Sequence, residues 1–459
     1  MTSSSDAGAP RRRRWWYVGA AVTVVAVVAV VVGLWWVRDG RYDVARRGWQ
    51  PTDALLAPMR EQPIPGWRIR VTDLGLPAAI DGTEASRIGV GNEPGGPRPI
   101  VGTVGDDAFL LAISGATPRP QWWLTGIDVR NGRSLFPAVA LTTTRPPECF
   151  LNGPAYVLCL SVDASPTAWV IDTKTGAMAY TGPTDLRTAS QTLSVRQVGN
   201  YAVAETDGQG VYGIGPRAET TWFVPGHGSA QPNSPRVSGS APSAVATQDA
   251  NAAQARDATV FALGDGTIVK PEIPEGVPLK TTFVYAGGFA ADVESASVLF
   301  FDEHGKRLGD AEGSLSTDQS ELPVVTEHDV STVYSPTGAP LLRGKTPPPS
   351  VVGTTAFVSE AGPQGVPLLR QYDLKTGAKG SACEFNLNNY LGTDGSVLVF
   401  AVGNPGSGSV AKAIDRATCD TLWTLPAEID SLARIWRVNS TLVRLSDDGT
   451  ELWSLVSPT

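Results

Sequence analysis

The four cysteines have the clearest capacity for chemistry in this sequence. They are Cys149, Cys159, Cys383 and Cys419. No two of them form a Cys-x-x-Cys pair, and the three histidines lie at no zinc-ligand spacing. The histidines are His227, His304 and His328. An even number of cysteines in an exported domain predicts two disulfides, with four unpaired buried thiols as the alternative.

The pairing of the cysteines can be predicted from one hairpin. Cys149 and Cys159 flank the turn Asn152-Gly153, a dipeptide typical of tight β-hairpins. Facing strands bring their Cα atoms within disulfide reach. We therefore predict the bond Cys149–Cys159, and the bond Cys383–Cys419 follows by elimination among three possible pairings.

Motifs of familiar enzymes are missing from the sequence. It contains no Gly-x-Ser-x-Gly elbow, no Walker loop and no His-Glu-x-x-His. The acidic pairs Asp106-Asp107 and Asp447-Asp448 lack the spaced ligands of a calcium loop, so we interpret them as solvated turn carboxylates. We expect no catalytic, cofactor-binding or metal-binding residue, although hydrolases without local motifs exist on many folds.

Two adjacent tryptophans, Trp122 and Trp123, form the remaining candidate binding site. Neighbouring side chains on a strand point to opposite sides, so the two rings cannot share one core. An exposed ring would suit a contact with a sugar, a lipid or a protein. The alternative, which we favour, is that this ring packs in a seam between repeated structural units.

An uncharged run extends from Trp15 to Val37. It is long enough to cross a bilayer as a helix. Tryptophans stand at both of its ends, as expected for the two membrane interfaces. No small-residue cleavage site follows the run, so we predict a retained anchor and not a signal peptide.

Charge alone leaves the orientation open, because four arginines precede the run and four follow it. Long domains translocate largely regardless of charge, and the cysteines favour export. We expect a single-pass plasma-membrane protein with a cytoplasmic N-terminus. The predicted parts are a basic tail at 1–14, a transmembrane helix at 15–37, a juxtamembrane linker at 38–66 and an extracytoplasmic domain at 67–459.

A short unit recurs through the large domain: a strand, an acidic or polar turn, a glycine, and often an aromatic residue four positions later. In the unit around Asp128, the carboxylate can accept hydrogen bonds from turn amides, and Gly132 permits a positive φ. The aromatic residue, here Phe136, is expected to pack between units. Five clear copies are 126–132, 170–176, 371–377, 413–419 and 445–449, and three weaker copies are 262–266, 301–305 and 334–338.

These turns resemble the PQQ-like propeller repeat, approximately Ala-x-Asp-x-x-Thr-Gly-x-x-x-Trp. The resemblance covers most of residues 99–456 and implies an all-β fold, a β-propeller of seven or eight blades. The strand Trp67–Val71 is then expected to close the ring by joining the last blade. PQQ-dependent dehydrogenases share the repeat, but their Cys-Cys dipeptide is missing here, which argues against a quinoprotein.

Two other segments carry structural expectations. Thr52–Arg60 is predicted as a short helix capped by Thr52 and ended by Pro63 and Pro65. Residues 226–255 are rich in Ser, Ala, Gln, Asn and Pro, which favours a long excursion between strands. That excursion is either a partner-binding loop or a solvated insertion.

Charge excludes one class of partner. The formal net charge is −8, and residues 1–47 carry eight Arg and three Asp, which leaves −13 for the remainder. An acidic domain of this kind is not built for nucleic acid. The basic N-terminal end suits an anionic membrane surface.

The expected function is binding or scaffolding in cell-envelope assembly or polar growth, without enzymatic turnover and without a cofactor. A composition rich in Ala, Val, Gly and Arg with few Lys is typical of a high-GC actinobacterium. The plan resembles mycobacterial membrane-anchored propellers of the polar growth factor A type. That resemblance implies the membrane, the trehalose-monomycolate exporter or a glycolipid as partners. A small-molecule-binding or catalytic, quinoprotein-like propeller is the alternative.

Overall fold

The computed structural model describes residues 40–458, apart from 52–54, 80–83, 90–98, 116–119, 144, 232–241, 250–256, 294–296, 317–319, 346, 385–386, 403–407 and 429–432. The predicted membrane span at 15–37 therefore lies outside the described residues. Within the described residues, no helix is long and apolar enough to cross a membrane.

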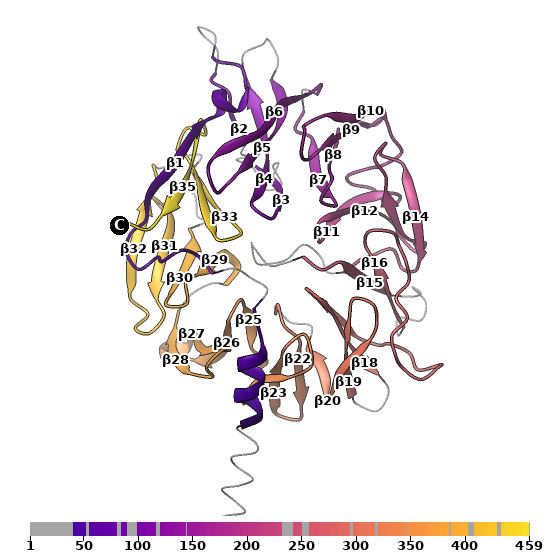
Figure 1. Cartoon of the computed structure of the whole chain (residues 1–459), viewed down its shortest axis with the longest axis vertical. Coiled ribbons are helices and arrows are strands. Elements are labelled where there is room, and N and C mark those ends of the chain that lie inside the picture. Colours follow the sequence, from indigo (N-terminus) through magenta and orange to yellow (C-terminus); the bar gives the residue numbers. More distant parts are fainter. Residues whose placement is uncertain are drawn as a thin grey trace, which may run out of the picture.

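Nine antiparallel sheets are arranged in a ring, which confirms the predicted all-β propeller (Figure 1). We number them blades 1 to 9 in chain order. Blade 1 contains β2 (Arg87–Ile88), β3 (Ile100–Val104), β4 (Asp107–Ser114), β5 (Gln121–Asp128) and β6 (Arg133–Leu141). Blade 2 contains β7 (Glu148–Asn152), β8 (Tyr156–Leu160), β9 (Thr167–Asp172) and β10 (Met178–Pro183). Blade 3 contains β11 (Ser194–Val198), β12 (Tyr201–Thr206), β13 (Gly210–Ile214) and β14 (Thr220–Pro225).

Blade 4 contains β15 (Val245–Asp249) and β16 (Ala258–Ala262). Blade 5 contains β17 (Thr282–Tyr285), β18 (Gly288–Val293), β19 (Ser297–Asp302) and β20 (Arg307–Glu312). Blade 6 contains β21 (Ser314–Ser316), β22 (Val324–Glu327), β23 (Val330–Tyr334) and β24 (Pro340–Lys345). Blade 7 contains β25 (Ser350–Val352), β26 (Thr355–Ala361), β27 (Pro367–Asp373) and β28 (Lys379–Cys383). Blade 8 contains β29 (Tyr390–Thr393), β30 (Val397–Ala401), β31 (Ser409–Asp415) and β32 (Thr421–Pro426). Blade 9 contains β33 (Arg434–Val438), β34 (Thr441–Leu445), β35 (Glu451–Val456) and β1 (Ile64–Arg70). Three 3-10 turns lie at η1 (Val71–Leu74), η2 (Pro363–Gly365) and η3 (Leu387–Asn389).

The core lies in the seams between neighbouring blades. Middle strands are buried on both faces, as in β8, where Val157 to Leu160 are all buried. The cluster between blades 1 and 2 joins Phe109 of β4 to Trp169 of β9. Since each sheet covers only its neighbours, the ring must close to leave no face exposed.

Closure is made by the N-terminal strand, as predicted. β1 pairs antiparallel with β35 and forms the outermost strand of blade 9. Trp67 of β1 donates its indole N–H to the carbonyl of Val129 in blade 1 at 2.7 Å. The two ends of the domain are thus joined in one sheet.

Among the described residues, blade 4 has two strands, whereas the other eight sheets have four or five. The amide of Gln231 donates to the carbonyl of Thr247, and the amide of Thr247 donates back. On the other side, Val269 N–H donates to Val260 at 2.9 Å. Short bridges therefore occupy the places of the first and fourth strands. The predicted seven or eight blades match the eight full sheets and omit this ninth one.

The repeated turns have the predicted hydrogen bonds. In blade 2, Asp172 Oδ1 accepts from the amides of Lys174 and Thr175 at 3.0 and 2.8 Å. Gly176 has φ +68°, and a Cβ there would lie 2.6 Å from the ring of Phe136 in blade 1. The turn therefore needs a glycine for two reasons: its φ is positive, and an aromatic ring packs directly against its Cα.

One repeat copy lies out of register. The copy at 445–449 follows the second strand of its blade, whereas the other seven copies follow the third strand. Blade 3 has the equivalent third-strand turn without the pattern. There, Ala218 takes φ +56°, and Glu219, not an aspartate, accepts from the amide of Arg217 at 2.7 Å.

The described residues between 40 and 74 form a clasp that crosses several blades. Residues 40–48 are helical, and their inward face presents Tyr42, Ala45 and Arg46, followed by Trp49. The helix predicted at Thr52–Arg60 is wrong over residues 55–60, which are not helical, while 52–54 lie outside the described residues. Pro58 removes a helical donor from this segment, and Gly48 suits the end of the preceding helix.

The clasp defines one face of the disc. Since successive strands are antiparallel, the turns after the first and third strands of a blade lie on one face and the remaining loops on the other. Arg46 Nε donates to Leu341 beside the third-strand turn of blade 6, and Leu56 N–H donates to Thr393 beside the first-strand turn of blade 8. We call this side the clasp face.

Candidate functional site

Both predicted disulfides are present. Cys149 and Cys159 are directly opposite one another on β7 and β8. Cys383 ends β28 of blade 7 and bonds Cys419 in the third-strand turn of blade 8. The first bond staples a hairpin, while the second joins two blades.

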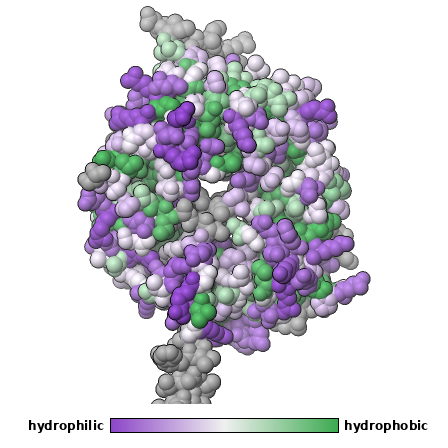
Figure 2. Space-filling view, in the orientation of Figure 1, coloured by the Kyte–Doolittle hydropathy of each residue, from purple (hydrophilic) through white to green (hydrophobic). Residues whose placement is uncertain are grey.

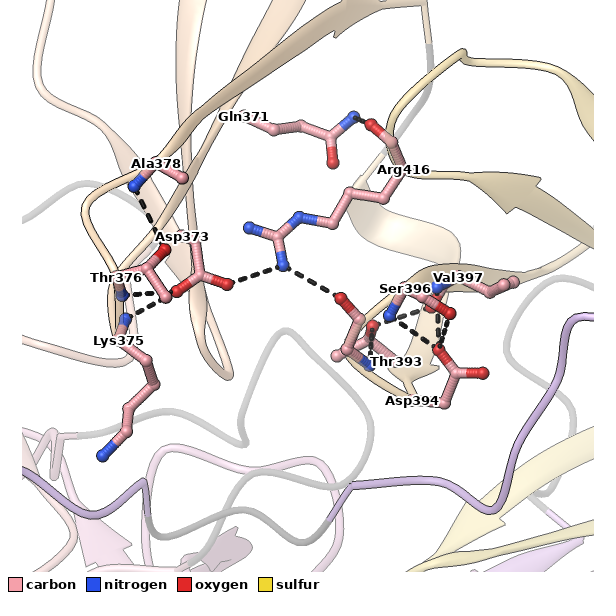
Figure 3. Close-up of polar contacts among 11 residues, drawn as sticks. Gln371, Asp373, Lys375, Thr376, Ala378, Thr393, Asp394, Ser396, Val397 and Arg416 are labelled. Carbon is pink, nitrogen blue, oxygen red and sulfur yellow. Dashed lines mark hydrogen bonds and ion pairs between the residues drawn. The ribbon is translucent and has the colours of Figure 1, made fainter.

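A polar network beside the second disulfide also joins blades 7 and 8 (Figure 3). Arg416 donates to Asp373 Oδ2 at 3.0 Å and to the carbonyl of Gly395 at 3.1 Å. Gln371 Nε2 donates to the carbonyl of Arg416 and to Cys383 Sγ. Clasp residue Met59 donates its amide to Asp394, at the edge of this network. These aspartates hold turns and blades together, which explains the repeat without invoking chemistry.

The turn carboxylates are stabilised as anions. Hydrogen bonds from the Thr175 hydroxyl and amide lower the pKa of Asp172. The Ala417 amide does the same for the pKa of Asp415. In the described part of the chain, no three His, Cys, Asp or Glu side chains are grouped to hold a metal ion.

The tryptophan pair occupies two different seams. Trp122 is buried in the cluster between blades 1 and 2 and is not accessible to a partner. Trp123 packs against the cluster shared by blades 9 and 1, is half-buried, and donates its indole N–H to Ser114 at 3.1 Å. Both rings therefore pack between blades, and that of Trp123 stays partly exposed. A partner contact by Trp123 stays a prediction.

A polar cavity of about 550 Å³ lies between blades 4 and 5. It is lined by Ser229, Gln231, Thr247, Gln248, Asp249, Lys280, Thr281 and Thr282. Asp249 ends the second strand of blade 4, and Thr282 begins the first strand of blade 5. Both positions belong to the side opposite the clasp face, which we call the pocket face.

The cavity lies where the described part of blade 4 has no full first strand. Where a full first strand would cover β15, the described residues place one bridge beside it, between Gln231 and Thr247. Gln248 is buried and holds the chain beside that bridge, accepting from Gly228 N–H at 3.0 Å and donating to Val224 O at 3.0 Å. Thr282 donates its hydroxyl to Thr247 across the two blades at 2.9 Å.

Two carboxylates lie near this region: Glu205 is buried and Asp292 is half-buried. Burial raises the pKa of Asp292, which accepts from Leu315 N–H at 2.8 Å. Burial also raises the pKa of Glu205, which accepts from Ala230 N–H at 2.8 Å and pairs with Arg196. Each carboxylate is held by neighbouring backbone, so both position the strands that carry the cavity.

The cavity offers hydroxyls, amides, one carboxylate and one ammonium group. No aromatic ring is among the described residues that line it. Stacking of a nucleobase is therefore unsupported, and directional hydrogen bonding dominates. The volume falls in the range typical of ligand pockets.

Sequence reasoning missed this cavity because it treated residues 226–255 as a loop. The segment instead contributes β15, whose Val-Ala-Thr-Gln-Asp sequence lacks clear apolar alternation. The weak signal that could have found it was the copy at 262–266, which requires preceding strands in the same blade.

Comparison with known proteins fits a nine-bladed count. A family model described as the conjugation-associated 9-bladed beta-propeller domain matches residues 42–458. The chain belongs to this family. The match begins inside the clasp helix, so the family domain includes residues 42–66, which were first interpreted as part of a linker.

A relative of similar length is an uncharacterized protein of Mycolicibacterium smegmatis (strain MKD8). It is 38% identical over 440 residues, covering 90% of this chain and 89% of the relative. Among solved structures, the designed Ika8 protein has a TM-score of 0.35 at 10% identity, covering 67% of this chain and 98% of that one. BamB from Moraxella catarrhalis has a TM-score of 0.31 at 12% identity, covering 86% and 97%.

Proposed function

We propose that this conjugation-associated propeller is a binding scaffold, tethered outside the plasma membrane, that holds a protein partner of the conjugation apparatus at its pocket face. The family description supports the conjugation apparatus as the setting. The scaffold acts without turnover. The finer resemblances, to PQQ-like propellers and to polar growth factor A, stay hypotheses.

The observation that carries the proposal is the polar cavity on the face left open by the clasp. Its hydroxyl and amide groups can satisfy the backbone of an inserted peptide. Asp249 and Lys280 can each pair with an opposite charge on that peptide. A polar segment of a partner protein is therefore the occupant that fits this chemistry.

Two further features support the setting. The disulfides Cys149–Cys159 and Cys383–Cys419 are typical of an oxidising compartment outside the cytoplasm. The uncharged run Trp15–Val37 would keep the domain at the membrane surface, which raises its effective concentration for membrane partners.

Site-specific photo-crosslinking in intact cells tests the proposal. A photoreactive residue at Gln231, on the cavity edge, should form an adduct with an envelope protein encoded with the transfer apparatus. The matched control is Lys174, in an exposed turn on the clasp face of blade 2, where no such adduct should form. Equal adducts from both positions would contradict the assignment of the face.

The result also separates alternative functions. An adduct from Gln231 with the trehalose-monomycolate exporter would keep the scaffold and change its partner. Oxidation of alcohols or sugars by the purified domain with added PQQ and Ca²⁺ would contradict a role limited to binding.

A further inference from the structure

The clasp helix is fixed to the propeller along its whole length. Tyr42 and Trp49 are 7% and 6% exposed, at opposite ends of the helical stretch. Trp49 packs with Leu341 of blade 6 and Leu374 of blade 7, so the helix fills the seam between these blades. Lys375 Nζ lies 5.7 Å from the Trp49 ring centroid and also donates to the Trp49 carbonyl.

Arg46 adds a specific contact at the same seam. Its guanidinium lies against Gly377, where a side-chain Cβ would clash with it. In blade 2 the equivalent glycine, Gly176, seats Phe136 of the preceding blade. Arg46 of the clasp therefore packs against Gly377 as Phe136 packs against Gly176, in place of a side chain from blade 6.

The direction of the helix sets where the chain leaves the disc. Figure 1 shows the helix running from the edge of the ring inward, over the strands of blades 6 and 7. Residues 40–48 form this helix, and its N-terminal end is the outer one.

Chain length then limits the distance to the membrane. The predicted span ends at Val37, three Cα steps before Gly40. Three residues can reach at most about 11 Å. Because the helix is held at both ends, the described clasp offers no hinge between the propeller and the predicted span.

We infer that the disc stands edge-on to the bilayer, with the rim of blades 6 and 7 against the lipid surface and both faces open sideways. This inference rests on the membrane tether of the proposed function and deepens it. An edge-on disc presents the cavity to proteins standing beside it in the membrane, and not to the lipid below.

Energy transfer to a labelled bilayer tests the orientation. The four native cysteines are paired, so a single new cysteine can carry the dye. Arg343→Cys labels the exposed outer strand of blade 6, and Thr181→Cys labels the exposed outer strand of blade 2 on the far side of the ring. The full chain is reconstituted in phosphatidylcholine–phosphatidylglycerol vesicles with acceptor headgroups.

The expected result is strong transfer from position 343 and weak transfer from position 181. Equal transfer from both, with the chain still floating with vesicles, would overturn the edge-on orientation and leave the tether intact. Loss of vesicle flotation would overturn both the tether and the orientation.

A second variant separates docking from anchoring. Tyr42→Ala with Trp49→Ala should release the helix, and the two rim positions should then give nearly equal transfer. Val44→Ala is the matched control, because Val44 is 64% exposed on the outer side of the helix. An unchanged difference in the double variant would show that the helix does not set the orientation.

Discussion

At the scale of single residues, the turn glycines and aspartates of the repeat determine how blades fit together. Gly176 and Gly208 have the same φ of +68°, but only Gly176 seats a neighbouring ring. A Cβ at Gly208 would meet nothing within 4 Å. The pair therefore separates backbone strain from steric overlap.

Gly176→Ala should be far more destabilising than Gly208→Ala. Both lose about 1–2 kcal/mol because an alanine resists positive φ. Only Gly176→Ala adds an overlap with Phe136, costing about 1–3 kcal/mol more. Chemical denaturation measures the difference, and equal midpoints for the two variants would contradict the seating role.

Acid should weaken the turns through their aspartates. The pKa of Asp172 is lowered in the folded state, so its contribution is complete above the unfolded pKa, about 4, and is lost as pH falls through the folded value. Asp172→Ala should cost about 1–2 kcal/mol at pH 7, through lost hydrogen bonds to a charged acceptor. Its deficit relative to the natural chain should shrink below pH 4. A deficit independent of pH would argue against the charged turn.

At the scale of elements, the clasp and the inter-blade disulfide link blades that their own sheets do not join. Met59 is fully buried, and its carbonyl accepts from Trp423 Nε1 at 2.8 Å. Met59→Ala should cost about 2–5 kcal/mol if the clasp is part of the core. Val44→Ala, on the exposed side, should change stability by less than about 0.5 kcal/mol. Similar effects from both would mean that the clasp is not integral.

The two disulfides should differ in their contribution. Cys383–Cys419 closes a separation of 36 residues, against 10 for Cys149–Cys159. In the chain-entropy account the longer loop stabilises by about 1 kcal/mol more. Paired alanine substitutions, compared in equilibrium unfolding, measure this. A larger loss from removing the hairpin bond would show that local packing, and not loop closure, dominates.

The sequence allowed prediction of elements wherever one local rule decided the structure. The hairpin around Gly153 fixed one disulfide, and Trp67–Val71 was recognisable as a closing strand. The clasp helix was misplaced because its stability comes from Tyr42 and Trp49 packing on distant blades, which no local pattern reports. β15 was missed for a similar reason: Thr247 and Gln248 pair with β16, and their side chains bond Thr282 of blade 5 and Val224 of blade 3.

At the scale of the whole molecule, the all-β ring was predictable and its count was not. Blade 3 hides its repeat by using Ala218 and Glu219 in place of glycine and aspartate, and the described part of blade 4 has two strands. The copy ending at Gly449 added one repeat to the predicted blade count, although its turn lies on the opposite face. The cavity could not be predicted because it lies where the described part of blade 4 has no full first strand, which is a property of the ring and not of any motif.

We propose that function lies at the pocket face of a propeller held beside other envelope proteins. DNA-transfer frequency in a deletion strain complemented with paired charge reversals tests this most directly. Lys280→Glu changes the cavity, and Lys174→Glu makes the same change on the clasp face. Deletion should lower transfer, and the natural chain and Lys174→Glu should restore it. Lys280→Glu should fall short by about tenfold, as expected for the loss of one charged contact. Normal transfer in the deletion strain, or equal rescue by both variants at equal protein levels, would contradict the account.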